Sequence, residues 1–351
     1  MCDLFLSWLF VYCRNFYIPL RMDNPSVKGV KLMRKTIIYI LATIVIIALA
    51  ATVYLLVLNQ GEADKFEGGD LVDDLGYSLT LTSPPERIVS LAPSNTEILF
   101  AVGAGDKVVG ITDFCNYPYD FAAWIEAGNM TSIGNYYGPS VEPIVALNPD
   151  LVLATTGSLE AAENLRELGY NVLVIEPRNI TFVLRDIDVV GRATNHYDEA
   201  VALESEINQR IEAVTSQVAA ATTTPKVYHE VWNEPIMSAG PGTFIDELIT
   251  LAGGGNIFND ATVSWPTASS EEIIEKNPDV MFFPDMYMGR SNFYETIEVV
   301  KDRPGWDTIT AVKNDALYEI NADIISRSGP RLVDALEDIA KMVHPEIFGQ
   351  P

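Results

Sequence analysis

The chain contains two blurred copies of one segment, and this internal repeat constrains its fold more than any other feature. Residues 142–150, EPIVALNPD, recur at 271–279 as EEIIEKNPD, and a short apolar run follows each copy. Further upstream, residues 88–103 and 236–253 both indicate a strand, a Pro-containing turn, an amphipathic helix and a terminating Gly. Self-similarity at long spacing is typical of repeated structural units. The repeat therefore predicts two lobes of one design, and two similar lobes commonly hold a ligand in the cleft between them.

Within each lobe, apolar runs alternate with helical patterns. This alternation predicts an α/β fold in which parallel or mixed central sheets carry helices on both faces, as in Rossmann-like domains. A helix opens at Pro93, where Ser94 or Asn95 can act as its N-cap. In the first lobe the predicted strands are 87–91, 108–111, 151–154 and 172–175.

The segment 198–221 differs from the rest because it lacks Gly and Pro and carries apolar residues at helical spacing. It predicts one helix about 36 Å long, from an N-cap at Asp198 to a stop at 222–225. Because it separates the two repeats, we interpret it as a rigid connecting helix between the lobes. An ordinary packed helix is the alternative interpretation.

Residues 37–58 form an uncharged apolar run that would span about 33 Å as a helix, enough to cross a bilayer. Residues 1–35 carry six of the 23 Lys and Arg residues but only two of the 48 acidic residues. The positive-inside rule then places the N-terminus in the cytoplasm and the body outside the cell membrane. We predict a single-pass transmembrane helix; a cleaved signal peptide is the alternative.

These patterns divide the chain into six parts. The net charge of −25 argues against a nucleic-acid partner and suits a soluble surface. Residues 59–85 are rich in Gly, Asp and Glu, with one candidate hairpin strand at 77–82. The predicted parts are a cytoplasmic extension or mis-assigned start (1–35), the transmembrane anchor or signal (36–58), a tether (59–85), the N-terminal lobe (86–197), the connecting helix (198–221) and the C-terminal lobe (222–345).

Signatures of catalysis are missing from the sequence. There is no nucleophile elbow and no phosphate-binding P-loop. His196, His229 and His344 are scattered, and His229 and Glu230, as neighbours on a strand, point to opposite faces. The sequence therefore predicts a protein that is not an enzyme and has no metal site and no cofactor of its own.

Aromatic and polar side chains follow several predicted strands. Ligands of open α/β sheets bind beyond the carboxyl ends of the strands, so these loops favour an aromatic-lined cleft. Asp323 and Arg327, after the predicted strand 316–320, can add a polar pair at its mouth; a surface salt bridge is the alternative. Aromatic residues that cap loop cores are the alternative for each ring. The rings in question are Phe114, Tyr117, Tyr136, Tyr137, Trp232 and Trp265.

Glu142 and Glu271 occupy the same place in the two repeats, at the start of a short helix. Acidic residues at this place are favourable with the helix dipole. The functional alternative is a matched pair of exposed acids that docks onto basic sites of a two-fold partner.

Taken in order, several motifs resemble the substrate-binding proteins of ABC importers whose lobes are joined by a helix. That family takes up cobalamin, ferric siderophores and haem, and the likeness runs from about residue 87 to 343. Its motifs here are RIVSLAPSNTE (87–97), TDFCNYP (112–118), EPIVALNPDLV (142–152), GGNIF (254–258), VSWP (263–266) and SRSGPR (326–331).

The closest resemblance is to cobalamin-binding proteins of that family. It implies an extracytoplasmic monomer that binds a corrinoid between its lobes and docks onto an ABC permease and its ATPase subunits through Glu142 and Glu271. One Trp of the cobalamin binders falls on Thr155 or Thr156 here, and another near Tyr136, so haem and ferric siderophores remain alternative ligands. A metal-dependent enzyme and a ligand-free scaffold are less favoured. The predicted ligand-binding residues are Pro93, Ser94, Phe114, Tyr136, Tyr137, Trp232, Trp265, Asp323 and Arg327.

Overall fold

The computed structural model describes residues 43, 45–46, 50, 66, 68–285 and 296–351. The chain divides into two compact units, Met1–Lys65 and Phe66–Pro351. In the first unit the few described residues are helical, and the predicted anchor at 37–58 lies almost wholly outside the described residues. None of the helices in the described part combines the length and apolar character needed to cross a membrane.

The first lobe is built on a five-stranded parallel sheet with the order β5-β4-β3-β6-β7. Its central strands are fully buried apolar runs, as expected of a sheet covered on both faces. The strands are β3 Ile88–Ser90, β4 Val108–Ile111, β5 Thr131–Ser132, β6 Leu151–Ala154 and β7 Val172–Val174. The helices are α3 Pro93–Ala101, α4 Phe121–Glu126, α5 Val141–Ala146, α6 Leu159–Glu167 and α7 Ile180–Thr194, with short 3-10 turns at Ala104–Lys107 and Thr156–Ser158.

The second lobe repeats this design with the parallel order β10-β8-β11-β12, and β9 pairs antiparallel with β8. Its strands are β8 Lys226–Asn233, β9 Ile236–Ser238, β10 Gly255–Asn256, β11 Val280–Pro284 and β12 Leu317–Ile320. Its helices are α9 Phe244–Leu251, α10 Ser270–Lys276, α11 Ile297–Lys301, α12 Thr310–Lys313, α13 Ala322–Ser326, α14 Leu332–Val343 and α15 Pro345–Phe348, with a 3-10 turn at Trp306–Thr308. The expectation of two like α/β lobes is therefore confirmed.

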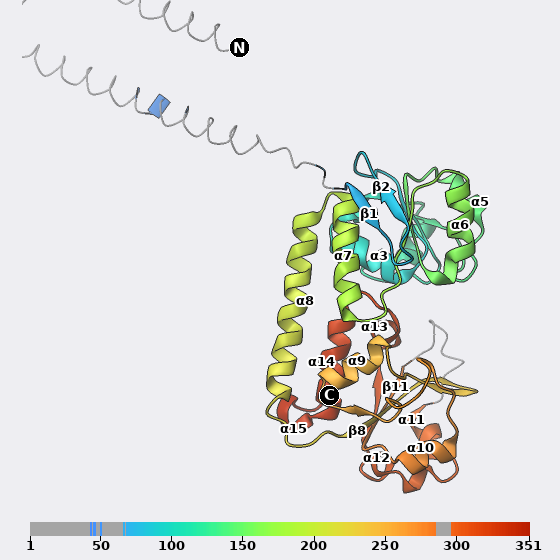
Figure 1. Ribbon diagram of the computed structural model, residues 1–351, viewed down its shortest axis with the longest axis vertical. Helices are drawn as coiled ribbons and strands as arrows, with labels where there is room; N and C mark the ends of the chain where they lie inside the picture. Colours follow the sequence, from blue (N-terminus) through green and yellow to red (C-terminus); the bar gives the residue numbers. More distant parts are fainter. Residues whose placement is uncertain (1–42, 44, 47–49, 51–65, 67, 286–295) are drawn as a thin grey trace, which may run out of the picture. The chain divides into compact units, whose positions relative to one another are not determined.

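Helix α8, Tyr197–Val218, follows the first lobe and precedes the second. It packs against α7 of the first lobe and against α14 and α9 of the second (Figure 1). Its buried positions, Ala200, Ile207 and Val214, lie seven residues apart, which keeps one face toward these partners. The helix begins one residue before the predicted cap: His196 is the N-cap, and Asp198 lies in the first turn.

The segment expected to be a tether contains a β-hairpin, β1 Asp70–Val72 with β2 Ser78–Thr80. Asp73, in the hairpin turn region, accepts a hydrogen bond from the amide of Val174 at 3.1 Å and forms an ion pair with Arg166 at 2.5 Å. The hairpin is thereby bonded to β7 and α6 of the first lobe. The structured body thus begins before the predicted boundary at residue 86.

The predicted N-cap of α3 was wrong. The N-cap is Ala92, whose methyl side chain cannot accept a capping bond, and Pro93 occupies the first helical position. Asn95 instead lies buried in the helix, where its Nδ2 donates to the carbonyl oxygen of Ala154 at 3.0 Å. This bond ties α3 to the carboxyl end of β6.

Candidate functional site

A cavity of about 970 Å³ is lined by residues from both lobes. In each sheet the order reverses beside the first strand of the lobe, between β3 and β6 and between β8 and β11. The cavity lies beyond the carboxyl ends of these strands, where open α/β sheets bind their ligands. Eight of the nine predicted ligand-binding residues line it: Pro93, Ser94, Phe114, Tyr136, Tyr137, Trp265, Asp323 and Arg327.

The first-lobe wall contains a pair of tyrosines. The rings of Tyr136 and Tyr137 meet edge to face with centroids 4.5 Å apart. The Tyr136 ring packs over Gly157, where an added Cβ would come within 3.1 Å of the ring. Burial raises the pKa of Tyr137, and the nearby Glu176 carboxylate raises it further, so its hydroxyl stays protonated. The pair presents aromatic surface to the cavity, with a neutral hydroxyl group on Tyr137.

The second-lobe wall contains Trp265, whose side chain is 44% exposed. Its loop is bonded to the strand β9 region: the amide of Ser238 donates to the carbonyl of Pro266 at 3.0 Å, and that of Gly240 to Ser264 at 2.8 Å. These backbone bonds fix the loop and leave the indole free to cover a ligand. An accessible ring at this turn agrees with the sequence prediction.

Trp232 is the one predicted ligand-binding residue that does not line the cavity. It lies in β8, where the strand pairs with β9, and its Nε1 donates to the carbonyl oxygen of Glu234 at 2.6 Å. The sequence could not distinguish it from the cavity aromatics because it also occupies a strand end.

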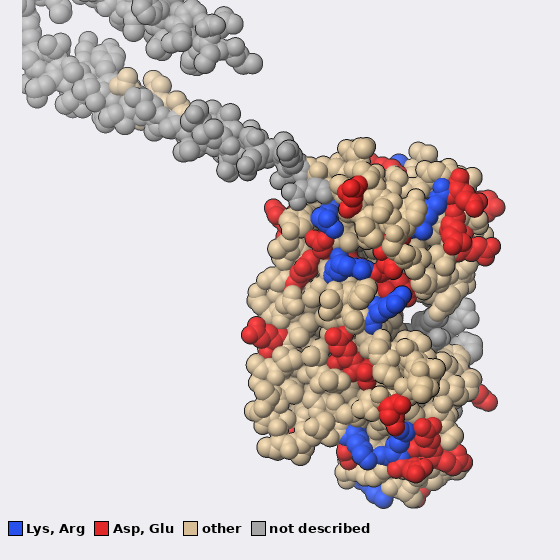
Figure 2. All heavy atoms as spheres, viewed as in Figure 1, with Lys and Arg blue, Asp and Glu red and all other residues tan. Residues whose placement is uncertain are grey.

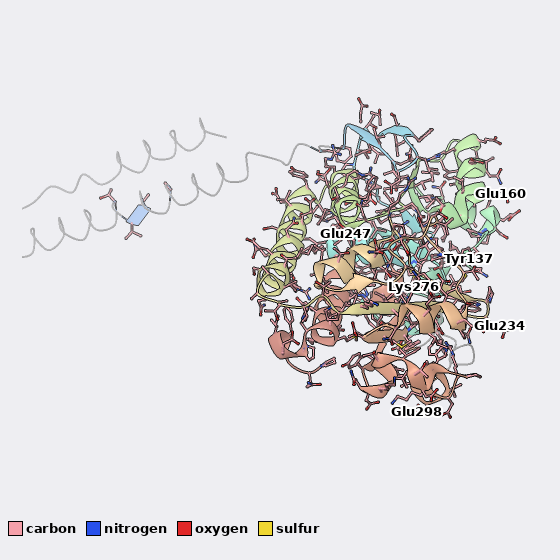
Figure 3. All side chains as sticks on the ribbon, turned by 60° about the horizontal axis from the view of Figure 1, so that its bottom comes forward. Tyr137, Glu160, Glu234, Glu247, Lys276 and Glu298 are labelled. Atoms are coloured by element: carbon pink, nitrogen blue, oxygen red, sulfur yellow. The ribbon has the colours of Figure 1, made fainter. Side chains whose placement is uncertain are left out.

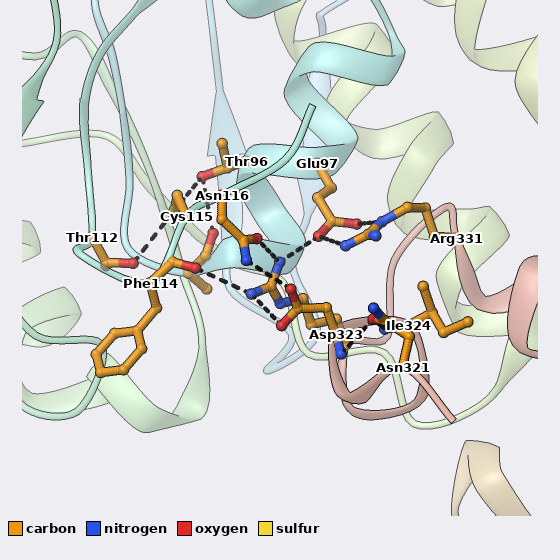
Figure 4. A network of polar contacts seen from close by, with 12 residues as sticks. Thr96, Glu97, Thr112, Phe114, Cys115, Asn116, Asn321, Asp323, Ile324 and Arg331 are labelled. Atoms are coloured by element: carbon orange, nitrogen blue, oxygen red, sulfur yellow. Dashed lines mark hydrogen bonds and ion pairs between the residues drawn. The ribbon is translucent and has the colours of Figure 1, made fainter. Parts of the chain in front are cut away.

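Asp323 and Arg327 belong to a polar network that joins the two lobes (Figure 4). From α13 and the residue after it, they contact the loop that follows β4. Arg327 Nη1 donates to Asn116 Oδ1 at 2.7 Å, and Asn116 Nδ2 donates to Asp323 Oδ2 at 2.7 Å. Arg327 also donates to the carbonyl of Phe114 at 3.1 Å. The predicted polar pair is thus present, and it already has protein partners.

Glu97 of α3 is the centre of this network on the first-lobe side. Its carboxylate accepts hydrogen bonds from Arg327 Nη1 at 2.9 Å and from Arg331 Nε and Nη2 at 2.8 and 2.7 Å. The Glu97 side chain is 2% exposed, so these are buried charge-assisted bonds. Burial lowers the pKa of Arg331, but the bonds and charges of Glu97 and Asp323 outweigh it and the net shift is upward.

The sequence alone gave Glu97 no individual role and did not predict its contacts between the lobes. A second such contact was also missed: Glu247 of α9 accepts a hydrogen bond from the amide of Ile180 at the start of α7, at 2.9 Å. Glu247 is labelled on α9 in Figure 3. Both acids look like ordinary helix-start residues in the sequence, and their partners lie 67 to 234 residues away along the chain.

Glu142 and Glu271 both lie exposed in the first turns of their helices, α5 and α10. Figure 1 shows α5 and α10 on the same side of the view, one in each lobe. Acidic side chains gather over both regions of that surface in Figure 2. The matched placement that the repeat predicted is therefore present.

The described ranges contain no metal-chelating cluster. No group of three or more His, Cys, Asp or Glu residues there is placed to hold a metal ion. Cys115, the neighbour of Phe114, is buried. Burial raises the pKa of the Cys115 thiol, which keeps the thiol protonated and unreactive.

Comparison with known proteins gives a consistent result. The family described as "Periplasmic binding protein" matches residues 88–324. A Bacillus subtilis protein described as an uncharacterized ABC transporter substrate-binding lipoprotein is 30% identical over 286 residues, covering 79% of this chain and 86% of that protein. The crystal structure of the vitamin B12-binding protein of Vibrio cholerae matches with a TM-score of 0.61 and 26% identity, covering 74% of this chain and 97% of that one. A haem-binding protein from Roseiflexus matches with a TM-score of 0.65 and 25% identity, covering 74% and 98%.

Proposed function

The chain belongs to the periplasmic binding protein family, and from this premise we propose that it captures a corrinoid between its lobes and delivers it to an ABC permease. Proteins of this family are binding components of transporters, so the chain is a binding protein and not an enzyme. Haem and ferric siderophores are the alternative ligands, because similar structures include a vitamin B12 binder and a haem binder.

The cavity carries this proposal. Its volume of about 970 Å³ lies near the upper end of ordinary small-molecule sites, which suits a large planar ligand. Aromatic rings stand on both walls, Tyr136 and Tyr137 from the first lobe and Trp265 from the second. Flat rings on two sides favour a flat macrocycle more than a small polar solute. We assign ligand contact to the eight lining residues and retain Trp232 only as a hairpin residue.

The connecting helix supports a binding mode with little closure. Helix α8 packs along both lobes, and the buried bonds of Glu97 and Glu247 join the lobes at two further places. We propose that α8 acts as a rigid strut and that the lobes change little in orientation on binding. With α8 as the connection, we propose that the lobes are residues 86–197 and 222–345, with the β1–β2 hairpin added to the first lobe.

For delivery, we propose that the exposed Glu142 and Glu271 dock the protein onto basic residues of the two-fold permease. The protein would act as a monomer, since one docking acid comes from each lobe. The uncharged run at 37–58 and the basic segment before it support a single-pass anchor that holds the body outside the membrane.

Titration of the full chain in detergent micelles tests the ligand. Tryptophan fluorescence and calorimetry would follow the addition of cobalamin, cobinamide, haemin and a ferric hydroxamate. One-to-one binding of corrinoids alone, with submicromolar affinity, supports the proposal. Binding of an iron chelate alone replaces the corrinoid by the alternative ligand, and binding of none of the four refutes the importer role proposed for this cavity.

Docking is tested by charge reversal in proteoliposomes that contain the permease. The double change Glu142→Arg with Glu271→Arg should abolish transport while ligand affinity stays unchanged, because both side chains lie outside the cavity. Reversal of Glu160, an acid in the first turn of α6, is the matched control and should leave transport intact. A loss of ligand affinity in the double variant would contradict a docking role.

A further inference from the structure

We propose that His229 supplies an axial nitrogen ligand to the metal of a metal-containing macrocycle bound in the cavity. This inference rests on the proposed function and narrows its ligand class to chelates in which the metal has an open or exchangeable axial position. Binding would form one bond from the lone pair of Nε2 to the metal and release one axial water, with no change in oxidation state.

The first support is the fixed tautomer of His229. Its Nδ1 lies 3.1 Å from the carbonyl oxygen of Phe282, which can only accept, so Nδ1 carries the proton. The ring also stacks on Phe282 with centroids 4.5 Å apart. Metal-ligating histidines usually donate their other N–H to a carbonyl or carboxylate, which fixes the ring and makes the free nitrogen more basic toward metal.

The second support is the position of the other nitrogen. His229 is 2% exposed and is one of the residues that line the cavity. Because Nδ1 is bonded to the Phe282 carbonyl, Nε2 is the ring nitrogen without a hydrogen bond in the described part of the chain. Nε2 is therefore the nitrogen of this cavity-lining ring whose lone pair is available to a ligand.

The third support is the protonation state. Burial lowers the pKa of His229 to about 4, so the imidazole is neutral at physiological pH. The groups packed around it are apolar or already bonded: Glu230, its neighbour on β8, points to the other face and accepts hydrogen bonds from Tyr228 and Arg303. A neutral imidazole with a free lone pair is the form that binds metals.

A single donor suits a metal that already has its other ligands. Within the described ranges no cluster of His, Cys, Asp and Glu could hold a bare ion, so one histidine alone would bind such an ion weakly. In a corrinoid or a haem the macrocycle supplies four nitrogens, and an imidazole is a usual axial ligand for the metal. The sequence analysis rejected His229 because Glu230 points away, but that reason applies only to a site that needs several protein ligands.

The ordinary explanation is a buried core histidine that satisfies its polar atoms. His344 fits it, because it is buried and its two ring nitrogens contact Glu346 and Gly253. His196 is only partly buried and does not line the cavity. His229 differs from both because it is buried, has a bond at Nδ1 only and lines the cavity.

The test uses two metal-containing probes, haemin and aquocobinamide, with two controls. Metal-free protoporphyrin controls for haemin, and dicyanocobinamide, whose axial positions are both filled, controls for the corrinoid. For at least one metal probe, the full-length protein should show the absorbance change of nitrogen ligation. In His229→Gln this change should disappear and affinity should fall about tenfold or more, while affinity for the matching control probe stays the same. His196→Gln should behave like the wild type.

Two measurements keep the test independent of variant folding. With ¹⁵N-histidine, the wild-type haemin or reduced cobinamide complex should show electron-spin coupling to one imidazole nitrogen. In His229→Gly, added free imidazole should restore the absorbance change. An unchanged spectrum in His229→Gln, or an equal loss of affinity for the control probe, would overturn the inference while leaving the proposed function intact. If the wild type binds neither metal probe, the inference about His229 fails, while binding of cobalamin or the ferric hydroxamate would still support the proposed function.

Discussion

Among the described residues, each lobe contains one buried glutamate that is bonded to arginine, and the two differ in where the arginines come from. Glu230 in the second lobe accepts bonds from Arg303 of the same lobe at 2.6 and 2.7 Å. Glu97 in the first lobe accepts bonds from Arg327 and Arg331, both of the second lobe. The chemistry is the same and both side chains are almost fully buried. Glu230 therefore stabilises one lobe, whereas Glu97 determines how the two lobes meet.

The difference separates stability from function. A bond inside one lobe contributes to folding of that lobe and leaves the cavity geometry to other contacts. The bonds of Glu97 lie beside the cavity, because its partner Arg327 lines the cavity, as does Ser94, which lies one turn before Glu97 on α3. Loss of Glu97 should therefore alter ligand binding as well as stability, and loss of Glu230 should alter stability alone.

The largest effect is expected for Glu230→Gln. The change removes the negative charge that accepts two hydrogen bonds from the Arg303 guanidinium, 13% exposed, so we expect the free energy of unfolding to fall by about 3–5 kcal/mol. Chemical denaturation measures the loss. The double variant Glu230→Leu with Arg303→Met should recover much of it, since apolar residues of similar volume can replace a buried pair. Ligand affinity of the folded fraction should not change; a changed affinity would contradict the separation of roles.

Glu97→Gln should have the next largest effect. Arg331 loses its main counter-charge, while Arg327 keeps Asp323 at 2.7 Å, so we expect a loss of about 3 kcal/mol. Unlike the Glu230 variant, this one should also bind ligand more weakly and show faster hydrogen exchange at α13. If its ligand affinity equals that of the wild type, Glu97 is a stabilising residue only and the two glutamates are equivalent.

The sequence predicted the parts that depend on local pattern. Two α/β lobes, the four strands predicted for the first lobe and the long helix near 198–221 follow from apolar periodicity and repeat, and the exposed Trp265 follows from its Pro turn. Helix α7 was missed because its residues, ITFVLRDIDVVGRAT, are rich in β-branched types of low helix propensity. Packing against α8 and α3 overrides that preference.

The polar connections between lobes could not be predicted because their partners are distant in sequence. Glu97, Asn116 and Arg331 carry no local mark that distinguishes them from surface residues, and only the fold brings them together. A ligand-binding role was predicted for Trp232 because an aromatic residue at a strand end is typical of such sites. Trp232 lies in the β8–β9 hairpin, however, and does not line the cavity.

The lobes also differ in how acid affects them, through His229 in the second and Asp186 in the first. The pKa of His229 is lowered to about 4, so the unfolded chain takes up a proton near pH 6.5 while the folded chain does not. Stability from His229 is present above pH 6.5 and is lost as the pH falls toward 4, by roughly 3 kcal/mol. Unfolding of wild type and His229→Gln, compared at pH 7 and pH 4.5, should show the wild-type advantage shrinking in acid.

Asp186 changes the stability with pH in the opposite direction to His229, so it serves as the control. Burial raises the pKa of Asp186 to about 6, against the lowering effect of Arg185. The folded chain then takes up a proton before the unfolded chain does, so the Asp186 contribution is present below about pH 4 and is lost as the pH rises through 6. In acid, the free energy of unfolding of the wild type should therefore rise relative to that of Asp186→Asn. If the stability difference from the wild type changes with pH in the same direction for both variants, the direction of one of the two pKa shifts is wrong.

The smallest effect is expected from the two aromatic walls of the cavity. Trp265 is 44% exposed without ligand and lines the cavity, so Trp265→Ala should weaken ligand binding by about 1–3 kcal/mol and lower the unfolding free energy by less than loss of a fully buried aromatic residue would. Tyr136 packs on Gly157 and Tyr137 in the absence of ligand, so Tyr136→Ala should lower both quantities. Calorimetric titration and thermal unfolding of the two variants separate these cases. A Trp265→Ala protein that binds with wild-type affinity would place the ligand against the first-lobe wall alone, and the cavity would then bind its ligand asymmetrically.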